Sequence, residues 1–298
     1  MWQQLLQQVQ QGNVKALARV ISLVENEAPQ FEEFLQALPA SGKKIIGITG
    51  PPGAGKSTLA DAIIRELVKR DQSVAVLCVD PSSPFNLGAL LGDRIRMSEW
   101  YNNPKVFIRS LATRGSLGGL HPKIIEISDL LRAAPFDHII IETVGVGQSE
   151  IEIAGLADTT LVVMVPEGGD EIQSMKAGMM EIADIFVVNK ADRPDADMVV
   201  KNLTLMLSPA FSTHKEIVPV LKTIASANVG IEELVEKIFT HQHNMYSSDK
   251  RFELLAERAY RLIQERRMKD VDKNELKERI KARFDQKDFN LYQFLQMQ

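Results

Sequence analysis

The chain has 298 residues, enough for one large α/β domain with helical additions or for two small domains. Its net charge of −4 and pI of about 5.8 lack the basic surplus of a dedicated nucleic-acid binder. No apolar run is long enough to span a bilayer, and residues 1–12 lack the features of a secretory or mitochondrial leader. The single cysteine, Cys78, is interpreted as a buried core thiol in a reducing compartment. We therefore expect a cytoplasmic protein without nucleic-acid or membrane partners.

Residues 1–42 are predicted to form a helical N-terminal extension. Apolar side chains recur there at helical spacing, as Trp2, Leu5, Leu6 and Val9. Gly12 interrupts the pattern, and Asn13 is placed to cap a second helix. Residues 39–42 read as a linker to the next region.

Residues 43–240 are predicted to form the core. Seven short apolar runs, rich in β-branched residues, alternate there with helical patterns: 44–49, 73–79, 105–109, 138–142, 160–165, 185–189 and 217–221. Nearly continuous hydrophobicity is typical of strands buried on both faces of a mostly parallel sheet. The intervening stretches fit crossover helices, so the predicted fold class is a doubly wound α/β sheet with helical N- and C-terminal extensions.

A phosphate-binding motif follows the first predicted strand. It fits G-x-x-x-x-G-K-[ST] and consists of Gly50, Pro51, Pro52, Gly53, Ala54, Gly55, Lys56 and Ser57. Its glycines let backbone N–H groups face phosphate, and the N-terminus of the following helix favours the anion. We expect Lys56 to reach the β- and γ-phosphates and the Ser57 hydroxyl to bind Mg²⁺. The motif predicts the P-loop NTPase fold.

Acidic residues end two of the predicted strands. Glu142 lies at the carboxyl end of the fourth strand, where ligands bind in open α/β sheets, and Asp80 ends the second strand in the same way. Gly145 is placed to offer its N–H group to the γ-phosphate. Asp93, a loop acid, is a weaker candidate for the same metal site.

The sixth predicted strand ends in the N-K-x-D pattern of guanine-specific P-loop proteins, formed by Asn189, Lys190 and Asp192. The Asp192 carboxylate can accept hydrogen bonds from guanine N1–H and the exocyclic amine, which adenine lacks at that edge, so an adenine would leave it unpaired. The Lys190 stem can cover the base plane. Ser226 and Ala227 fit the short loop whose backbone N–H meets guanine O6. The order of these motifs predicts GTP rather than ATP.

Hydrolysis is predicted to be slow without a partner. The residue after the E-x-x-G segment is Val146, which cannot orient water as a glutamine does in Ras-like enzymes. Gln148 and Glu150 lie nearby at a different offset. We therefore expect a loop or a partner to complete the catalytic groups.

Residues 241–298 are charged and predicted to be helical. Five apolar residues fall on one face, namely Phe252, Leu255, Ala259, Leu262 and Ile263, and Asp272 could cap a further helix. The pattern leaves open whether this region caps the core or forms a dimer or partner surface.

Seven segments resemble, in this order, the MeaB/ArgK/MMAA-type GTPases: GPPGAGKS, VDPSSP, LLGDRIRM, TRGSLGG, ETVGVGQSE, GGDEIQSMKAGMMEIAD and NKAD. The resemblance covers residues 40–240 closely. It implies a homodimeric G-protein chaperone of a cobalamin-dependent acyl-CoA mutase, such as methylmalonyl-CoA mutase. GTP binding and hydrolysis would gate adenosylcobalamin loading from an adenosyltransferase and protect the mutase, with C-terminal helices contributing to the dimer.

The resemblance also implies roles for individual residues. Thr58 joins Lys56 and Ser57 in the phosphate loop, and the three acids implied in magnesium binding and hydrolysis are Asp80, Asp93 and Glu142. Residues 168–176 resemble the third switch of the family, so Gln173 and Lys176 are implied in signalling to the mutase.

Three alternatives remain at this point. A metal-insertion GTPase of similar fold would need a Cys/His loading site, whereas Cys78 is alone and His241 and His243 read as helix-end cations. An ATP-dependent small-molecule kinase is disfavoured by Asp192. A protein-targeting GTPase would need an added RNA- or signal-binding module. No motif indicates that cobalamin itself binds to this chain.

Overall fold

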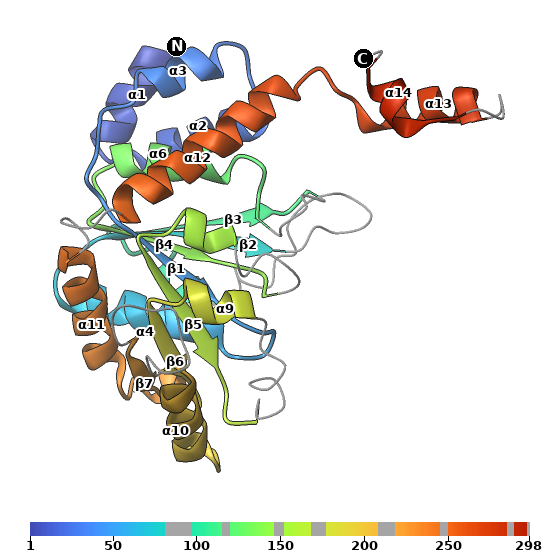
Figure 1. The fold of residues 1–298 in the computed structure, drawn as a ribbon. Coiled ribbons are helices and arrows are strands. Elements are labelled where there is room, and N and C mark those ends of the chain that lie inside the picture. Colours follow the sequence, from blue (N-terminus) through green and yellow to red (C-terminus); the bar gives the residue numbers. More distant parts are fainter. Residues whose placement is uncertain are drawn as a thin grey trace. The chain divides into compact units, whose positions relative to one another are not determined.

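The computed structural model describes residues 1–80, 97–114, 120–145, 152–167, 177–207, 218–244, 250–284 and 289–296. The chain divides into two compact units, Met1–Arg251 and Phe252–Gln298. Among the described helices, none combines the length and the apolar composition that a membrane crossing requires. Figure 1 shows the elements of both units.

A seven-stranded sheet forms the centre of the first unit. Its strands are β1 (Ile45–Thr49), β2 (Val74–Asp80), β3 (Val106–Ala112), β4 (His138–Glu142), β5 (Thr159–Met164), β6 (Ile185–Val188) and β7 (Val220–Lys222). The order across the sheet is β3-β2-β4-β1-β5-β6-β7, and each neighbouring pair is parallel. Strands are added on both sides of β1, which confirms the predicted doubly wound fold.

Two strands depart from their predicted limits by three residues at one end, and the others by at most one residue at an end. β3 continues to Ala112, three residues past its predicted end at residue 109. The polar pair Arg109–Ser110 interrupts the apolar run, but Arg109 donates to the Glu25 carboxylate at 2.6 Å and is therefore tolerated within the strand. β7 begins at Val220 rather than at residue 217, and its residues are only partly buried.

Helices connect and flank the strands. In the first unit they are α1 (Trp2–Gln10), α2 (Val14–Glu25), α3 (Phe31–Gln36), α4 (Lys56–Lys69), α6 (Ile124–Ala133), α9 (Ala177–Ile182), α10 (Ala196–Met206) and α11 (Ile231–Asn244), with the short 3₁₀ turns η1 (Ser98–Trp100), η2 (Ile153–Gly155) and η3 (Ala225–Ala227). The predicted domain limit between residues 240 and 241 falls inside α11, because its helical pattern continues to Asn244.

The N-terminal extension is helical, and Asn13 caps α2 as predicted by accepting a hydrogen bond from Ala16 N at 3.0 Å. Helix α1 packs against α2, and α2 packs against α6. The rings of Trp2 and Phe34 lie 4.8 Å apart, which joins α1 to α3.

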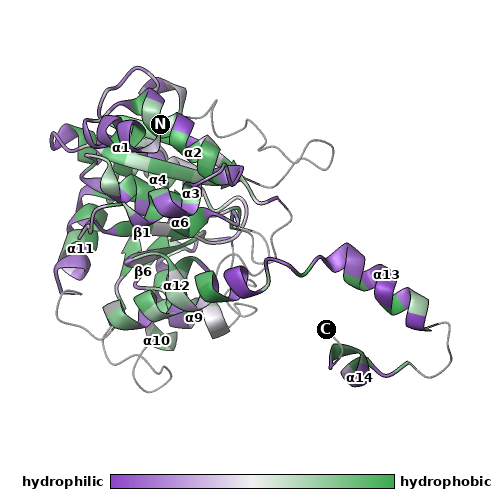
Figure 2. Cartoon of the chain, turned by 90° about the horizontal axis from the view of Figure 1, so that it is seen from above, coloured by the Kyte–Doolittle hydropathy of each residue, from purple (hydrophilic) through white to green (hydrophobic). Residues whose placement is uncertain are grey.

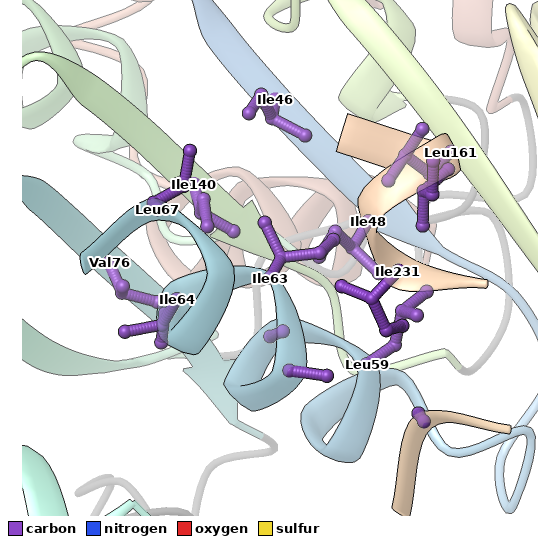
Figure 3. Close-up of a cluster of buried hydrophobic side chains, with 14 of the residues drawn as sticks. Ile46, Ile48, Leu59, Ile63, Ile64, Leu67, Val76, Ile140, Leu161 and Ile231 are labelled. Atoms are coloured by element: carbon purple, nitrogen blue, oxygen red, sulfur yellow. The ribbon is translucent and has the colours of Figure 1, made fainter. Parts of the chain in front are cut away.

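The core of the first unit lies on both faces of the sheet. On one face, α4 and α11 cover the strands, and Figure 3 shows Ile63 and Leu67 of α4 directed toward Ile48 and Ile140. On the other face, α9 and α10 cover β5 and β6 around Phe186. Burial of one side of α4 fixes its N-terminus at the carboxyl end of β1, where the phosphate motif lies.

The second unit contains most of α12 (Lys250–Arg267), together with α13 (Lys273–Phe284) and α14 (Leu291–Leu295). Asp272 caps α13 as predicted, since its Oδ1 accepts hydrogen bonds from Asn274 N at 2.7 Å and Glu275 N at 2.8 Å. Figure 2 shows α13 mostly in the hydrophilic colour. The ring of Phe284, at its end, lies 5.6 Å from the ring of Phe289, which in turn lies 6.0 Å from the ring of Phe294 in α14.

Candidate functional site

The phosphate motif forms the turn between β1 and α4. Gly55, directly before α4, has a φ of +87°, and a Cβ there would lie 2.5 Å from Asn189 Nδ2. Glycine is therefore required, because a side chain would face both an unfavourable backbone conformation and a steric clash. The turn leaves the N-terminus of α4 at the carboxyl edge of the sheet, where the unbonded backbone N–H groups of the first helical turn favour an anion.

Lys56 is buried inside this turn with 7% of its surface exposed. Its Nζ donates to the carbonyl oxygens of Gly50, at 2.9 Å, and Pro51, at 3.1 Å. The ammonium group is thus held against the loop by two neutral carbonyl acceptors. Such a bound cation can transfer its hydrogen bonds to phosphate oxygens, which are stronger, charged acceptors.

Oxygen donors gather beside Lys56 from three elements. The Ser57 Oγ, in the first turn of α4, donates to Glu142 Oε1 at 2.6 Å. Glu142 ends β4 and pairs in register with Cys78 of β2, and Asp80 lies two residues farther along that strand. Because alternate residues of a strand share a face, Asp80 and Glu142 lie on the α4 side of the sheet. A hydroxyl and two carboxylates are a donor set that suits Mg²⁺.

The exit from β4 is fixed against β1. Thr143 N donates to Ile48 O at 3.0 Å, and its Oγ1 donates to Thr49 Oγ1 at 3.0 Å. Gly145 then turns with a φ of +80°, and a Cβ there would lie 2.2 Å from Lys56 Nζ. The backbone of Gly145 therefore lies directly against the phosphate loop, as its predicted role requires.

Asn189 joins three segments of the site. It is 2% exposed, and its Nδ2 donates to Ala54 O in the phosphate loop at 3.1 Å. Its Oδ1 accepts from Thr223 Oγ1 and from Ala225 N, each at 3.1 Å. The N-K-x-D motif predicts a role for Asn189. No sequence pattern predicts the hydrogen bond from Thr223, because a threonine after a strand is common.

The other members of the predicted base site lie nearby on exposed turns. Lys190 has a φ of +56°, and its Nζ donates to Gly53 O at 2.7 Å. Asp192 is exposed two residues farther on. Ser226 and Ala227 are exposed on η3, which begins at the Asn189-bound Ala225, and Ala227 N donates to Ile224 O at 2.9 Å.

Several predicted residues lie outside the described part of the chain, namely Asp93, Val146, Gln148, Glu150, Gln173 and Lys176. Thr58 is described and exposed in the first turn of α4. The structure therefore brings together the phosphate loop, Asp80, Glu142, Gly145 and Asn189, and the roles of these residues toward a ligand stay predictions.

The sequence matches a known family over most of its length. The family model described as methylmalonyl-CoA mutase-associated GTPase MeaB matches residues 17–283. A putative GTPase of Pyrococcus abyssi is 48% identical over 244 residues, which cover 80% of this chain and 75% of that protein. A fused isobutyryl-CoA mutase of Geobacillus kaustophilus is 38% identical over 236 residues, which are 74% of this chain but 22% of that protein.

A solved structure shows the same fold. The crystal structure of a LAO/AO transport system kinase superposes with a TM-score of 0.70 at 24% sequence identity, covering 99% of this chain and 95% of that chain. At that identity the likeness concerns the fold alone. The family match, the relatives and the geometry around the phosphate loop agree, and the chain belongs to the family of methylmalonyl-CoA mutase-associated GTPases, MeaB, whose members hydrolyse GTP.

Proposed function

We propose that this GTPase requires Mg²⁺ and serves a cobalamin-dependent acyl-CoA mutase, where GTP binding and hydrolysis gate adenosylcobalamin loading and protect the mutase. Two findings support the mutase as partner. The family is described by its association with methylmalonyl-CoA mutase, and a related segment lies within a fused isobutyryl-CoA mutase. Fusion into one chain keeps two interacting modules at a high effective concentration.

The magnesium requirement rests on the contact between Ser57 and Glu142. The 2.6 Å hydrogen bond holds a hydroxyl and a carboxylate beside the buried Lys56, with Asp80 on the neighbouring strand. Ser57, Glu142 and Asp80 would hold the ion, with Asp93 as a further predicted ligand. When bound, Mg²⁺ supplies positive charge that offsets the negative charge on the β- and γ-phosphate oxygens during transfer.

The residues of this chain contribute mainly by positioning. Lys56 would exchange Gly50 O and Pro51 O for phosphate oxygens, and the backbone N–H groups at the start of α4 would bind the same phosphates. Gly145, whose Cα faces Lys56 Nζ, would offer its N–H group to the γ-phosphate. Because Val146 cannot orient the attacking water, we expect the partner or a loop to supply that group, a contribution of about 10³–10⁵-fold in related GTPases.

Guanine selection is assigned to Asp192. Asn189 ties its strand end to the phosphate loop and to the turn before Ser226, so base-reading and phosphate-binding segments keep a fixed separation. The Asp192 carboxylate would accept the two guanine N–H donors. Lys190 would cover the base, and the backbone of Ser226–Ala227 would meet guanine O6.

We also propose a homodimer in the cytoplasm, with an adenosyltransferase as the source of the cofactor. Phe252, Leu255 and Ile263 recur at helical spacing along α12, and each is about half exposed or more. Apolar residues arranged in this way suit a helix–helix contact with a second copy. Cys78 is the single cysteine of the sequence and is fully buried, which suits a reducing compartment.

The deciding experiment measures GTP hydrolysis by the purified protein with Mg²⁺ or with EDTA, alone and with methylmalonyl-CoA mutase or isobutyryl-CoA mutase, and with ATP in place of GTP. We expect slow, Mg²⁺-dependent turnover that rises when a mutase is added, and little turnover of ATP. GTP turnover indifferent to both mutases would contradict the mutase proposal and favour the metal-insertion alternative. A preference for ATP would contradict the reading of Asp192.

A further inference from the structure

A cluster of charged residues joins the N-terminal helices to the end of β3, away from the phosphate loop. Its centre is Glu25, the last residue of α2, whose side chain is 9% exposed. An acidic side chain at the C-terminus of a helix is disfavoured by the helix dipole, so its burial there requires nearby cations. Arg109 of β3 supplies one, donating to Glu25 Oε2 at 2.6 Å and to Ser22 Oγ at 3.0 Å.

Arg114 supplies a second cation and also acts on the backbone. Its Nη1 donates to the carbonyl oxygen of Glu25 at 3.1 Å, while its Nη2 lies 3.9 Å from Glu25 Oε1. Arg114 has a φ of +49°, a left-handed conformation that is unfavourable for a residue with a side chain. Such strain persists only where surrounding contacts enforce it, and the contacts to Glu25 are placed to do so.

His121 completes the cluster from the start of α6. Its Nδ1 accepts a hydrogen bond from Lys123 N at 3.0 Å, so the neutral imidazole carries its proton on Nε2. That nitrogen lies 3.6 Å from Glu25 Oε1, and the imidazole is almost fully buried. Glu25 is thus approached by groups from β3, from the turn after β3 and from the start of α6.

The turn after β3 is bonded directly to one of the proposed magnesium ligands. Ala112, the last residue of β3, pairs with Asp80, the last residue of β2. Thr113 N extends this ladder by donating to Asp80 O at 3.0 Å, and Arg114 follows at once. The backbone that carries the Asp80 carboxylate is therefore one hydrogen bond away from the strained residue that Glu25 holds.

We propose that Glu25 is a positioning residue for the GTPase site, because through Arg109 and Arg114 it fixes the turn after β3 and thereby the backbone of Asp80. In this proposal, the N-terminal helices contribute to the geometry of the GTPase site as well as to the packing of the first unit. The inference rests on the proposed binding of Mg²⁺ by Asp80. It adds a residue on the opposite face of the sheet to the determinants of magnesium binding.

The test compares the full-length wild-type protein with the variants Glu25→Gln and Glu27→Gln in GTP turnover over a range of Mg²⁺ and GTP concentrations. Glu27 is the matched control, since it lies two residues away and pairs with Lys123 at 3.0 Å but not with β3. We expect E25Q to raise the Mg²⁺ concentration for half-maximal turnover about 3- to 10-fold and to lower kcat. The KM for GTP should stay within about twofold in both variants, and E27Q should match the wild type.

A third variant, Arg114→Gly, tests the same contacts independently, in case E25Q fails to fold. Glycine adopts a φ of +49° without strain, so R114G removes the guanidinium contacts while the turn remains accessible. We expect the same shift in Mg²⁺ dependence, with a thermal midpoint close to that of the wild type. If GTP turnover by E25Q and R114G depends on Mg²⁺ as it does in the wild type, the positioning role is overturned and the magnesium proposal stands. If turnover by the wild type is independent of Mg²⁺, the magnesium proposal itself is refuted.

Discussion

The two ends of the parallel sheet use acidic residues differently. At the amino end, Asp137, Asp158 and Asp184 each lie directly before a strand, and each accepts the backbone N–H group at or next to the start of the adjacent strand. The donors are Ser73 N and Ile45 N, both at 2.7 Å, and Thr160 N at 2.8 Å. These carboxylates are bonded to fixed backbone donors.

At the carboxyl end, the acids meet side chains and loops instead. Glu142 accepts from the Ser57 hydroxyl, and Asp80 stands on the neighbouring strand beside the turn after β3. A hydroxyl can give up its hydrogen bond to a ligand, whereas a strand N–H group cannot move without opening the sheet. Stability and activity are therefore separated along the strands, so substitutions at the amino end should lower stability and substitutions at the carboxyl end should lower activity.

The largest expected effect is at the carboxyl end, for Lys56→Ala. The variant loses the cation that we assign to the phosphates, so kcat/KM for GTP should fall on the order of 10²–10³-fold. The thermal midpoint should change little, because Lys56 Nζ donates to carbonyl oxygens of the loop, those of Gly50 and Pro51. Steady-state turnover and a melting curve on the same sample test the prediction, and an inactive variant that is also unfolded would contradict it.

The next effect concerns base selection by Asp192. In Asp192→Asn the amide offers one acceptor and one donor, which matches xanthine, where a carbonyl replaces the exocyclic amine of guanine. We expect kcat/KM for GTP to fall at least about 10²-fold and that for xanthosine triphosphate to rise. Competition between the two nucleotides measures the exchange. Equal losses with both nucleotides would place guanine recognition elsewhere.

At the amino end, Asp158→Ala should act on stability instead. Asp158 Oδ2 accepts from Ile45 N and from Arg132 Nη2, at 2.7 and 3.0 Å, and removing it leaves both donors buried. We expect a loss of about 3 kcal/mol in the free energy of unfolding, with the kcat/KM of the folded fraction unchanged. Denaturant unfolding and GTP turnover at low temperature separate these quantities, and the control is Asp129→Ala, an exposed partner of the same arginine.

The smallest effect is a pH dependence of stability that originates in the Glu25 cluster, at His121. Burial lowers the pKa of His121 from 6.5 to about 4, although Glu25 opposes the shift and the nearby cations add to it. The unfolded chain therefore binds the proton first as the pH falls. The stability that the neutral imidazole contributes is complete above pH 6.5 and is lost as the pH falls toward 4.

Between pH 7.5 and 5, the pKa difference of His121 lowers the free energy of unfolding of the wild type by about 2 kcal/mol. The loss of unfolding free energy over that interval should be smaller by this amount in His121→Gln than in the wild type. Chemical denaturation at both pH values measures it. An equal loss in the two proteins would mean that His121 is protonated in the folded state.

The fold was predictable because buried parallel strands are apolar on both faces, and each of the seven apolar runs became a strand. The ends of the strands and helices were less predictable than their existence. β3 continues three residues past the predicted run, which ends at Arg109, and that arginine is paired with Glu25, more than eighty positions earlier. The helical pattern of α11 also continues past the expected domain limit between residues 240 and 241.

The candidate site was predictable where a fixed spacing encodes it, as in the phosphate loop and around Asn189. Its supporting contacts were not, because they join residues far apart in sequence. Thr143 bonds to Thr49, and Thr223 bonds to Asn189, yet neither threonine stands in a recognisable pattern. The roles of the aspartates before the strands depend on similar long-range contacts, although their shared position directly before a strand is a signal that other parallel sheets can be searched for.

The strand order has a consequence for synthesis of the chain. β1 is the first strand to be synthesised, but it lies in the middle of the sheet. Its neighbours are β4, where Ile45 lies opposite Ile139, and β5, where Ile46 lies opposite Thr159. Roughly a hundred further residues must leave the ribosome before either edge of β1 can be covered. Until then, the unpaired backbone and the apolar side chains of β1 are exposed to incorrect pairing. We therefore expect the nascent chain to bind general chaperones.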